Sequence, residues 1–231
     1  MPRNPLHRWD LAPDEARIIQ RELADRLDTT SPLGPCRLIA AADVSYNRGD
    51  DRLFAAVVVI DAETDAIVER SGLIATASYP YVPGLLSFRE APAVLDAFDR
   101  LRHRPDVLIC DGQGIAHPRR LGIASHVGLW LDLPTVGCAK SRLCGTFEEL
   151  GPERGDRSPL IHLGETIGVA LRTKRRTNPV YVSPGHRCDL DSAIRIVLET
   201  TGTYRLSTPI RFAHAYVNEL RRQAGERPAP P

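Results

Sequence analysis

Two aspartates of this 231-residue chain stand at the ends of apolar runs. Asp43 follows residues 38–42 (LIAAA) and Asp111 follows residues 107–110 (VLIC), and such runs are typical of buried strands. Glu90 lies in the first turn of a predicted helix, from which it could return to the same sheet edge. Three carboxylates from three elements would form an oxygen-rich site suited to Mg²⁺ or Mn²⁺, ions that activate water in phosphodiester cleavage. Taken singly, each aspartate could instead cap a turn.

Two further residues could assist such a site. Lys140 directly follows a predicted strand at residues 135–139, and its ammonium could neutralise charge on a phosphate in the transition state. A solvated surface lysine is the alternative. His214 lies on an apolar helical stripe, so a core histidine is the simpler interpretation. If that helix face covers the carboxylates, the imidazole could orient water or transfer a proton.

A stiff aromatic loop precedes Glu90. In the run Tyr79-Pro80-Tyr81-Val82-Pro83-Gly84, prolines fix φ on both sides of the second tyrosine. A rigid aromatic tip can wedge between stacked bases. On composition alone, a proline-rich connector with surface tyrosines is the simpler interpretation.

The turn after the second apolar run is rich in glycine. Residues 111–117 (DGQGIAH) have a GxG spacing after a strand, which suggests a dinucleotide site. His117 occupies the place of the third glycine and Pro118 follows it, so the match is weak. Glycines here would more readily let a flat ligand such as an extruded base approach the backbone, with residues 121–123 (LGI) and 143–145 (LCG) as further walls.

Composition predicts a folded, non-exported protein with one basic region. Hydrophobic residues make up 42% and charged residues 26%, which disfavours disorder. The apolar runs fall short of the ~20 residues of a membrane-spanning helix, the first residues do not resemble a secretory signal, and five scattered cysteines fit a reducing cytoplasm. The basic side chains are concentrated near the end of the sequence. Residues 1–171 carry 19 basic and 24 acidic side chains, whereas residues 172–222 carry 10 basic and 4 acidic side chains. The basic run at 172–176 (RTKRR) suits phosphate contacts, although a solvated hairpin tip explains it as well.

Periodicity and turn signals predict a mixed α/β protein. The expected strands are residues 37–44, 53–60, 67–77, 107–110, 135–139, 166–171 and 180–182, with a hairpin loop at 47–51 and an interior loop at 151–159. The expected helices are residues 11–27, 87–101, 121–131, 189–200 and 209–222. An antiparallel three-strand meander followed by helices and parallel strands is the order of a ribonuclease H-like sheet, and a doubly wound nucleotide-binding fold is the rival. We expect a single domain at residues 1–222 and a flexible tail at 223–231.

These residues fall within longer blocks that follow one another along the chain. The blocks are ADVSY at 42–46, YPYVPGLLSFRE at 79–90, PDVLICDGQGIAHPR at 105–119, LGIASH at 121–126, GCAKSRL at 137–143, VSPGH at 182–186 and AH at 213–214. In content and order they resemble the endonuclease V family, the deoxyinosine-specific repair nucleases. The likeness spans residues from about 36 to 222 and implies a ribonuclease H-like fold.

The resemblance also implies a site and a reaction. It implies a Mg²⁺-dependent deoxyribonuclease, with Mn²⁺ as a substitute, whose catalytic residues are Asp43, Glu90, Asp111, Lys140 and His214, the three acids holding the metal. It implies a strand-separating wedge at Pro80, Tyr81, Val82 and Pro83. A lesion pocket made largely of main-chain groups maps onto Gly84, Leu85, Gly112, Gly122, Ile123 and Leu143, with His117 as a further substrate contact. Cleavage is expected at the second phosphodiester bond 3′ to deoxyinosine, leaving a 3′-hydroxyl and a 5′-phosphate.

Other functions stay open at this point. The expected partner is DNA containing deoxyinosine, and inosine-containing RNA is a second substrate of some relatives. Neither a membrane nor an obligate protein partner is predicted. The alternatives are a ribonuclease H-like nuclease acting on branched DNA or RNA–DNA hybrids, and a lesion-binding protein without catalysis.

Overall fold

A computed structural model describes residues 5–47 and 49–225 of the protein. Its strands are β1 (Leu38–Ser45), β2 (Arg52–Asp61), β3 (Ile67–Thr76), β4 (Val107–Cys110), β5 (Thr135–Ala139), β6 (Arg157–His162), β7 (Glu165–Leu171) and β8 (Val180–His186). Its helices are α1 (Pro13–Ala24), α2 (Leu86–Asp99), α3 (Ile123–Leu131), α4 (Leu190–Glu199) and α5 (Thr208–Gln223).

One mixed sheet runs through the molecule in the order β3-β2-β1-β4-β5-β8-β7-β6. β1, β2 and β3 pair antiparallel, whereas β4 lies parallel to both β1 and β5. This arrangement confirms the predicted ribonuclease H-like mixed sheet. The doubly wound rival is wrong, because its strands would run parallel throughout that half of the sheet.

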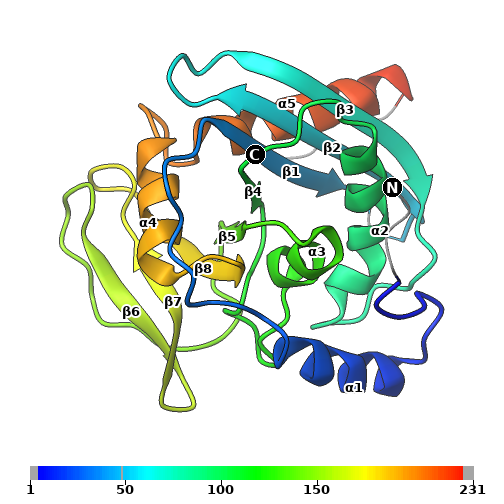
Figure 1. Ribbon diagram of the computed structural model, residues 1–231, viewed down its shortest axis with the longest axis horizontal. Coiled ribbons are helices and arrows are strands. Elements are labelled where there is room, and N and C mark those ends of the chain that lie inside the picture. Colours follow the sequence, from blue (N-terminus) through cyan, green and yellow to red (C-terminus); the bar gives the residue numbers. More distant parts are fainter. Residues whose placement is uncertain (1–4, 48, 226–231) are drawn as a thin grey trace.

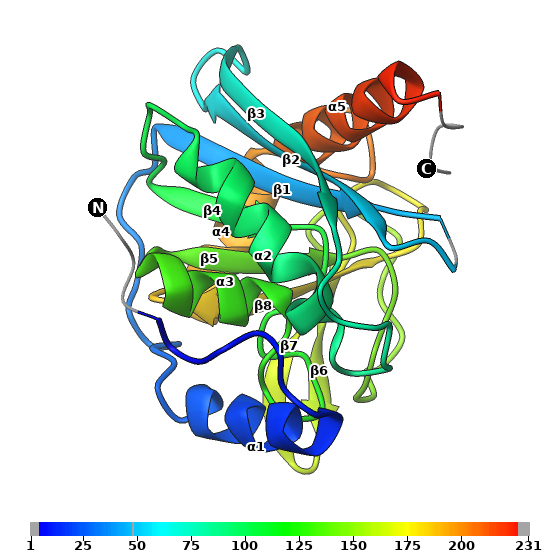
Figure 2. The ribbon, with the colours of Figure 1, turned by 90° about the vertical axis from the view of Figure 1, so that its right-hand side faces the viewer.

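Helices cover both faces of the sheet, and the alternation of side chains along each strand explains how (Figures 1 and 2). Ile39 and Ala41 of β1 pack with α4 and α5 in one core, whereas Ala40 and Ala42 pack with α2 and α3 in the other. Apolar residues on successive positions therefore make β1 a strand that is buried on both sides.

α1 packs beyond α3, at the lower edge of the molecule in Figure 2. Its first turn contains Pro13, whose fixed φ suits a helix start, and Glu15 accepts a hydrogen bond from the backbone nitrogen of Ala12 at 2.9 Å. The face toward the protein buries Ala16 and Leu23, and with them the polar Gln20, whose side chain is fully buried.

Several sequence-based boundaries differ from the structure, and β8 extends to His186, four residues beyond the predicted 180–182. The predicted interior loop at 151–159 overlaps β6, an edge strand that contains Pro159 and pairs with β7. The first helix ends at Ala24 instead of residue 27, because the backbone nitrogens of Arg26 and Leu27 bond the carbonyl oxygens of Leu23 and Ala24, only three residues back. The last helix extends to Gln223, so the predicted flexible tail at 223–231 begins inside α5, and residues 226–231 lie outside the described part of the chain.

Two other features bear on the composition arguments. Within residues 5–47 and 49–225, no helix combines the length and apolar character that crossing a bilayer requires. All five cysteines are free thiols, and Cys110, Cys138 and Cys188 are buried.

Candidate active site

Two adjacent parallel strands bring the aspartates together. The register of β1 and β4 pairs Ala42 with Cys110, so Asp43 and Asp111 are the next residues on neighbouring strands. The backbone nitrogen of Asp111 donates to the carbonyl oxygen of Ala42 at 3.2 Å, which continues the ladder to this point. Glu90 reaches the same edge from the second turn of α2 instead of the predicted first turn, because the helix begins at Leu86, and all three carboxylates line one small cleft.

That edge opens into a larger depression, which we call the first cavity. Its volume is about 480 Å³, a size typical of small-ligand sites. Strand ends, the start of α2, the glycine turns and α5 all contribute to its wall. The predicted site residues among the lining are Asp43, Tyr81, Val82, Pro83, Gly84, Glu90, Asp111, Gly112, His117, Gly122, Ile123, Lys140, Leu143 and His214.

Two of the carboxylates each contact a basic side chain. The Nζ atom of Lys140 lies 3.2 Å from Oδ2 of Asp111. Nδ1 of His214 lies 2.9 Å from Oδ2 of Asp43, and Nε2 of the same ring lies 3.1 Å from Nδ2 of Asn218. If the Asn218 amide donates, the ring accepts at Nε2 and carries its proton on Nδ1, pointed at Asp43. The apolar stripe of α5 therefore does cover the carboxylate edge.

The buried carboxylates disfavour one another's charge. Burial, followed by the charges of Asp43 and Asp111, raises the pKa of Glu90 from 4.5 to about 8. Burial and the charge of Asp43 also raise the pKa of Asp111, and Lys140 only partly opposes this. The edge thus concentrates more negative charge than its own cations neutralise.

The residues fit a divalent cation in charge and donor type. Carboxylate oxygens are the ligands that Mg²⁺ and Mn²⁺ prefer, and a cation between them would relieve the repulsion that raises the pKa of Glu90. Within the described residues, however, no three His, Cys, Asp or Glu side chains already form a ligand set. Asp43 and Asp111 are instead turned to His214 and Lys140.

Residues 80–84, which we call the proline loop, form one lip of the first cavity. Tyr81 is 61% exposed at its tip, and Val82 and Pro83 line the cavity, whereas the exposed Pro80 does not. The neighbouring Tyr79 is buried in a small core with Phe88. An exposed ring is thus held on a stiff loop whose base is anchored in the protein.

The carbonyl oxygen of Gly84 ties this loop to two other segments. It accepts hydrogen bonds from Nε2 of Gln20 at 3.0 Å, from Nη2 of Arg119 at 2.7 Å and from Nε2 of His117 at 3.1 Å. Gly84 has a φ of +76°, and a Cβ there would lie 2.7 Å from Nη2 of Arg119. Glycine is required at this position for both conformation and space.

His117 is held in one neutral form. Its Nδ1 accepts from the backbone nitrogen of Arg119 at 3.1 Å, so its proton resides on Nε2 and is donated to Gly84. Burial and the charge of Arg119 lower the pKa of His117 to about 4. The residue therefore lines the cavity as an uncharged hydrogen-bonding group at neutral pH.

Five of the six predicted lesion-pocket residues line the first cavity, and Leu85 does not. The Leu85 side chain is fully buried in the core formed with Ala16 and Phe88, because the turn before α2 points it inward. Gly122 has a second task, since a Cβ there would lie 2.2 Å from the carbonyl oxygen of Gln113. Because Gly122 has no side chain, its backbone packs against that of Gln113, and a ligand can also approach it closely.

Several lining or supporting residues were not found from the sequence. They are Gln20, Ser87, Gln113, Arg119 and Asn218. Of these, Gln20 had a detectable signal, because it lies four residues after Ala16 and three before Leu23 on the buried face of α1. Gln113 bonds the carbonyl oxygen of Ser141 at 2.9 Å and so links the glycine turn to the segment after β5.

Comparison with known proteins places this site in a family. A family model described as Endonuclease V matches residues 21–215. Endonuclease V of Myxococcus xanthus is 50% identical over 95% of this chain and 94% of its own. The crystal structure of Endonuclease V from Streptomyces avermitilis has a TM-score of 0.89 and 41% identity, and covers 94% of this chain and 96% of its own. A further crystal structure is that of Ciona intestinalis Endonuclease V in complex with DNA containing an inosine followed by a ribo-adenosine. It has a TM-score of 0.78 and 26% identity, and covers 91% of this chain and 98% of its own.

These likenesses assign the chain to the nucleases. It belongs to the endonuclease V family, as the ordered sequence blocks predict, and its first cavity is formed by the residues that carry that resemblance.

Proposed function

We propose that this nuclease cleaves the second phosphodiester bond 3′ to deoxyinosine in DNA, leaving a 3′-hydroxyl and a 5′-phosphate with the altered base still attached. The observation that carries the proposal is the composition of the first cavity. Its lining contains Asp43, Glu90 and Asp111 together with the proline loop and its exposed Tyr81. A site for phosphodiester chemistry thus adjoins a loop that could separate stacked bases. The inosine-containing DNA bound to the Ciona relative supports this substrate class.

Asp43, Glu90 and Asp111 would hold Mg²⁺, with Mn²⁺ as a substitute. Such an ion, when bound, activates water and stabilises the leaving oxygen of a phosphodiester. Its charge would also make it favourable for Glu90 to lose the proton that it retains at neutral pH in the metal-free protein.

The remaining polar residues have separate tasks. Lys140 lies beside Asp111 and is only partly buried, so its ammonium could turn to a phosphate oxygen. His214 is oriented by Asn218 and Asp43, and in this position its ring can exchange a proton with water at the carboxylate edge. These residues would act on the phosphate and the water, away from the base.

The other part of the cavity suits an extruded base. Gly112, Gly122 and Ile123 present backbone and a small apolar surface, and His117 is uncharged there. A flat base can approach glycine closely, and main-chain groups can bond its polar edge. Tyr81 would fill the gap that the base leaves in the duplex.

The test is nicking of a labelled duplex with one inosine, compared with the same duplex carrying adenine, in Mg²⁺ and in EDTA. We expect nicking of the inosine duplex in Mg²⁺ alone, and no nicking by Asp43→Ala or Asp111→Ala while binding of the inosine duplex persists. Asp96→Ala is the matched control, because Asp96 is exposed on α2. Equal nicking of the adenine duplex, or nicking that persists in EDTA, would refute the proposal.

A further inference from the structure

A second cavity adjoins the first. Its volume is about 490 Å³, and it shares Lys140, Ser141 and Arg142 with the first cavity. The rest of its wall comes from the segment before β6 (Phe147, Glu149, Leu150), the β7–β8 loop (Arg172, Asn178, Pro179), Tyr181 of β8 and Arg205 before α5. Residues 140–142 thus form a common wall between two cavities of similar size.

The second cavity is cationic. Arg142, Arg172 and Arg205 line it together with Lys140, whereas Glu149 is the one acid among its described lining residues. Within the described chain, neither Arg172 nor Arg205 forms an ion pair with a carboxylate. Both guanidinium groups therefore retain an unneutralised positive charge.

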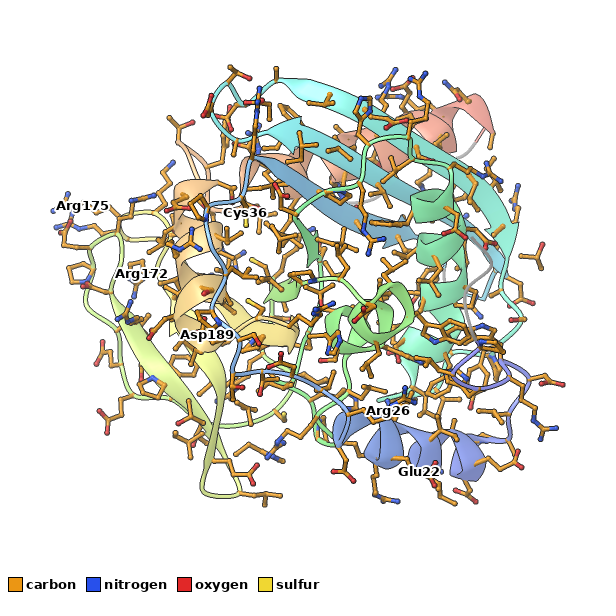
Figure 3. All side chains as sticks on the ribbon, viewed as in Figure 1. Glu22, Arg26, Cys36, Arg172, Arg175 and Asp189 are labelled. Atoms are coloured by element: carbon orange, nitrogen blue, oxygen red, sulfur yellow. The ribbon has the colours of Figure 1, made fainter. Side chains whose placement is uncertain are left out.

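Backbone carbonyl groups fix these two charges in place. Nη2 of Arg205 donates to the carbonyl oxygens of Lys140 at 2.7 Å and Pro179 at 2.8 Å, and its Nε donates to that of Asn178 at 2.9 Å. Arg172 donates to the carbonyl oxygens of Gly151, Leu150 and Thr177. Figure 3 shows Arg172 on the loop between β7 and β8, at the edge of the molecule.

Aromatic rings form another part of the wall. The rings of Phe147 and Tyr181 meet edge to face with centroids 5.8 Å apart, and the guanidinium of Arg142 lies 5.6 Å from the centroid of Phe147. Half-buried rings beside positioned guanidinium groups offer stacking for a base or sugar and charge for a phosphate.

We propose that the second cavity binds a nucleotide of the nucleic-acid strand held in the first cavity, outside the lesion pocket, with its phosphate on the arginines and its base or sugar against Phe147 and Tyr181. The inference extends the proposed function, because the strand is the one whose phosphate meets the carboxylates. Because residues 140–142 line both cavities, the second cavity is the next one that a strand leaving the first past Lys140 and Arg142 meets. This assigns a function to Arg172 and Arg205 of the basic region at residues 172–222, which the cleavage site does not use.

Two isosteric changes alter the charge of this cavity in opposite directions. Asn178→Asp adds a negative charge at an exposed lining residue, and Glu149→Gln removes one. Glu148→Gln is the matched control, because Glu148 is exposed next to Glu149 but does not line the cavity. A unit charge about 7 Å from a phosphate changes the affinity roughly three- to tenfold at low salt. We therefore expect Asn178→Asp to weaken binding by about that factor, Glu149→Gln to strengthen it, and Glu148→Gln to change it less than about twofold.

The measurement is fluorescence anisotropy of the full-length protein in EDTA with labelled oligonucleotides, whose integrity is checked on a denaturing gel. The probes are an inosine strand, the same strand with adenine, and inosine strands shortened on the 3′ or the 5′ side of the inosine. The two changes should act on both long strands, and their effect should disappear when the arm that occupies the second cavity is removed. The shortened strand whose affinity no longer responds to the two changes shows whether the second cavity binds nucleotides on the 3′ or the 5′ side of the inosine.

The two proposals fail in different ways. Equal affinity of every variant for a given strand, equal effects of Glu148→Gln and Glu149→Gln, or effects that persist in both shortened strands would overturn the second-cavity inference. Equal affinity of the wild-type protein for inosine and adenine strands, with the charge changes still effective, would count against the lesion pocket and leave the second cavity standing.

Discussion

Neutralising Glu90 should stabilise the metal-free protein while abolishing cleavage. Burial and the neighbouring aspartates raise the pKa of Glu90 from 4.5 to about 8 in the folded protein. A carboxyl group whose pKa is higher in the folded than in the unfolded chain takes up a proton on folding, so it lowers the free energy of unfolding above its unfolded pKa. The destabilisation is absent well below pH 4.5, increases up to pH 8 and is constant above it.

The magnitude follows from that interval. One pKa unit corresponds to ~1.4 kcal/mol, so the interval from 4.5 to a working pH of 7 amounts to about 3 kcal/mol. Gln keeps the shape of the side chain and removes its charge. Glu90→Gln should therefore raise the free energy of unfolding by up to about 3 kcal/mol at pH 7, which is roughly 6–12 °C in Tm for a chain of this length.

The assay is thermal unfolding in EDTA at several pH values between 4 and 8. The difference in Tm between Glu90→Gln and the wild-type protein should be near zero at pH 4 and increase with pH, whereas Glu22→Gln, an exposed change on α1, should show no such trend. Mg²⁺ should stabilise the wild-type protein more than the variant, because a bound cation removes the same repulsion. A variant less stable than wild type at pH 7, or a difference independent of pH, would refute the electrostatic reasoning.

Three further changes test other parts of the site. Gln20→Leu removes one of the three hydrogen bonds to the carbonyl oxygen of Gly84 and the bond from Gln20 to that of Leu121, at a cost of about 1–3 kcal/mol, so KM for an inosine duplex should rise; an unchanged KM would contradict the positioning role. Tyr81→Ala should reduce cleavage of an inosine duplex more than cleavage of an inosine single strand, since its exposed ring is expected to act between paired strands; equal losses would argue against a wedge. Gly114→Ala would place a Cβ 2.0 Å from the carbonyl oxygen of Pro184 and should cost about 3 kcal/mol or more in thermal or urea unfolding, whereas Gly202→Ala, with no atom within 4 Å, should be nearly neutral; similar stability of the two would show that the packing is wrong.

The sequence predicts the acidic edge well because its cause is local. An apolar run that ends in Asp places the carboxylate at a strand end, and two parallel neighbours place two such ends together, as the pairing of Ala42 with Cys110 does here. The approach of Glu90 depends on the turn before α2, which the predicted helix allows but the sequence pattern does not fix. Its raised pKa depends on burial, which no spacing of residues reveals.

Other features depend on tertiary contacts that the pattern hides. The spacing of Gln20 places it on the buried face of α1, but its role depends on tertiary structure, because its amide donates to two carbonyl groups from distant loops. The sequence predicts a loop over the first three residues of β6, because they contain Pro159 and place Ser158 at a buried position where an apolar residue is expected. An edge strand tolerates proline, since one side of its backbone has no partner strand.

The three donors on Gly84 determine where the proline loop can bend. Two of them come from residues 117–119 and one from α1, so a swing of the whole loop would break bonds to both segments at once. The hinge must therefore lie beyond Gly84, between Pro80 and Pro83, where the prolines themselves restrict the backbone. Entry of a ligand should then be accompanied by rotation of the Tyr81 side chain over a stationary rim, and the three hydrogen bonds on the carbonyl oxygen of Gly84 should have the same lengths in a structure of the free protein and in one of a complex.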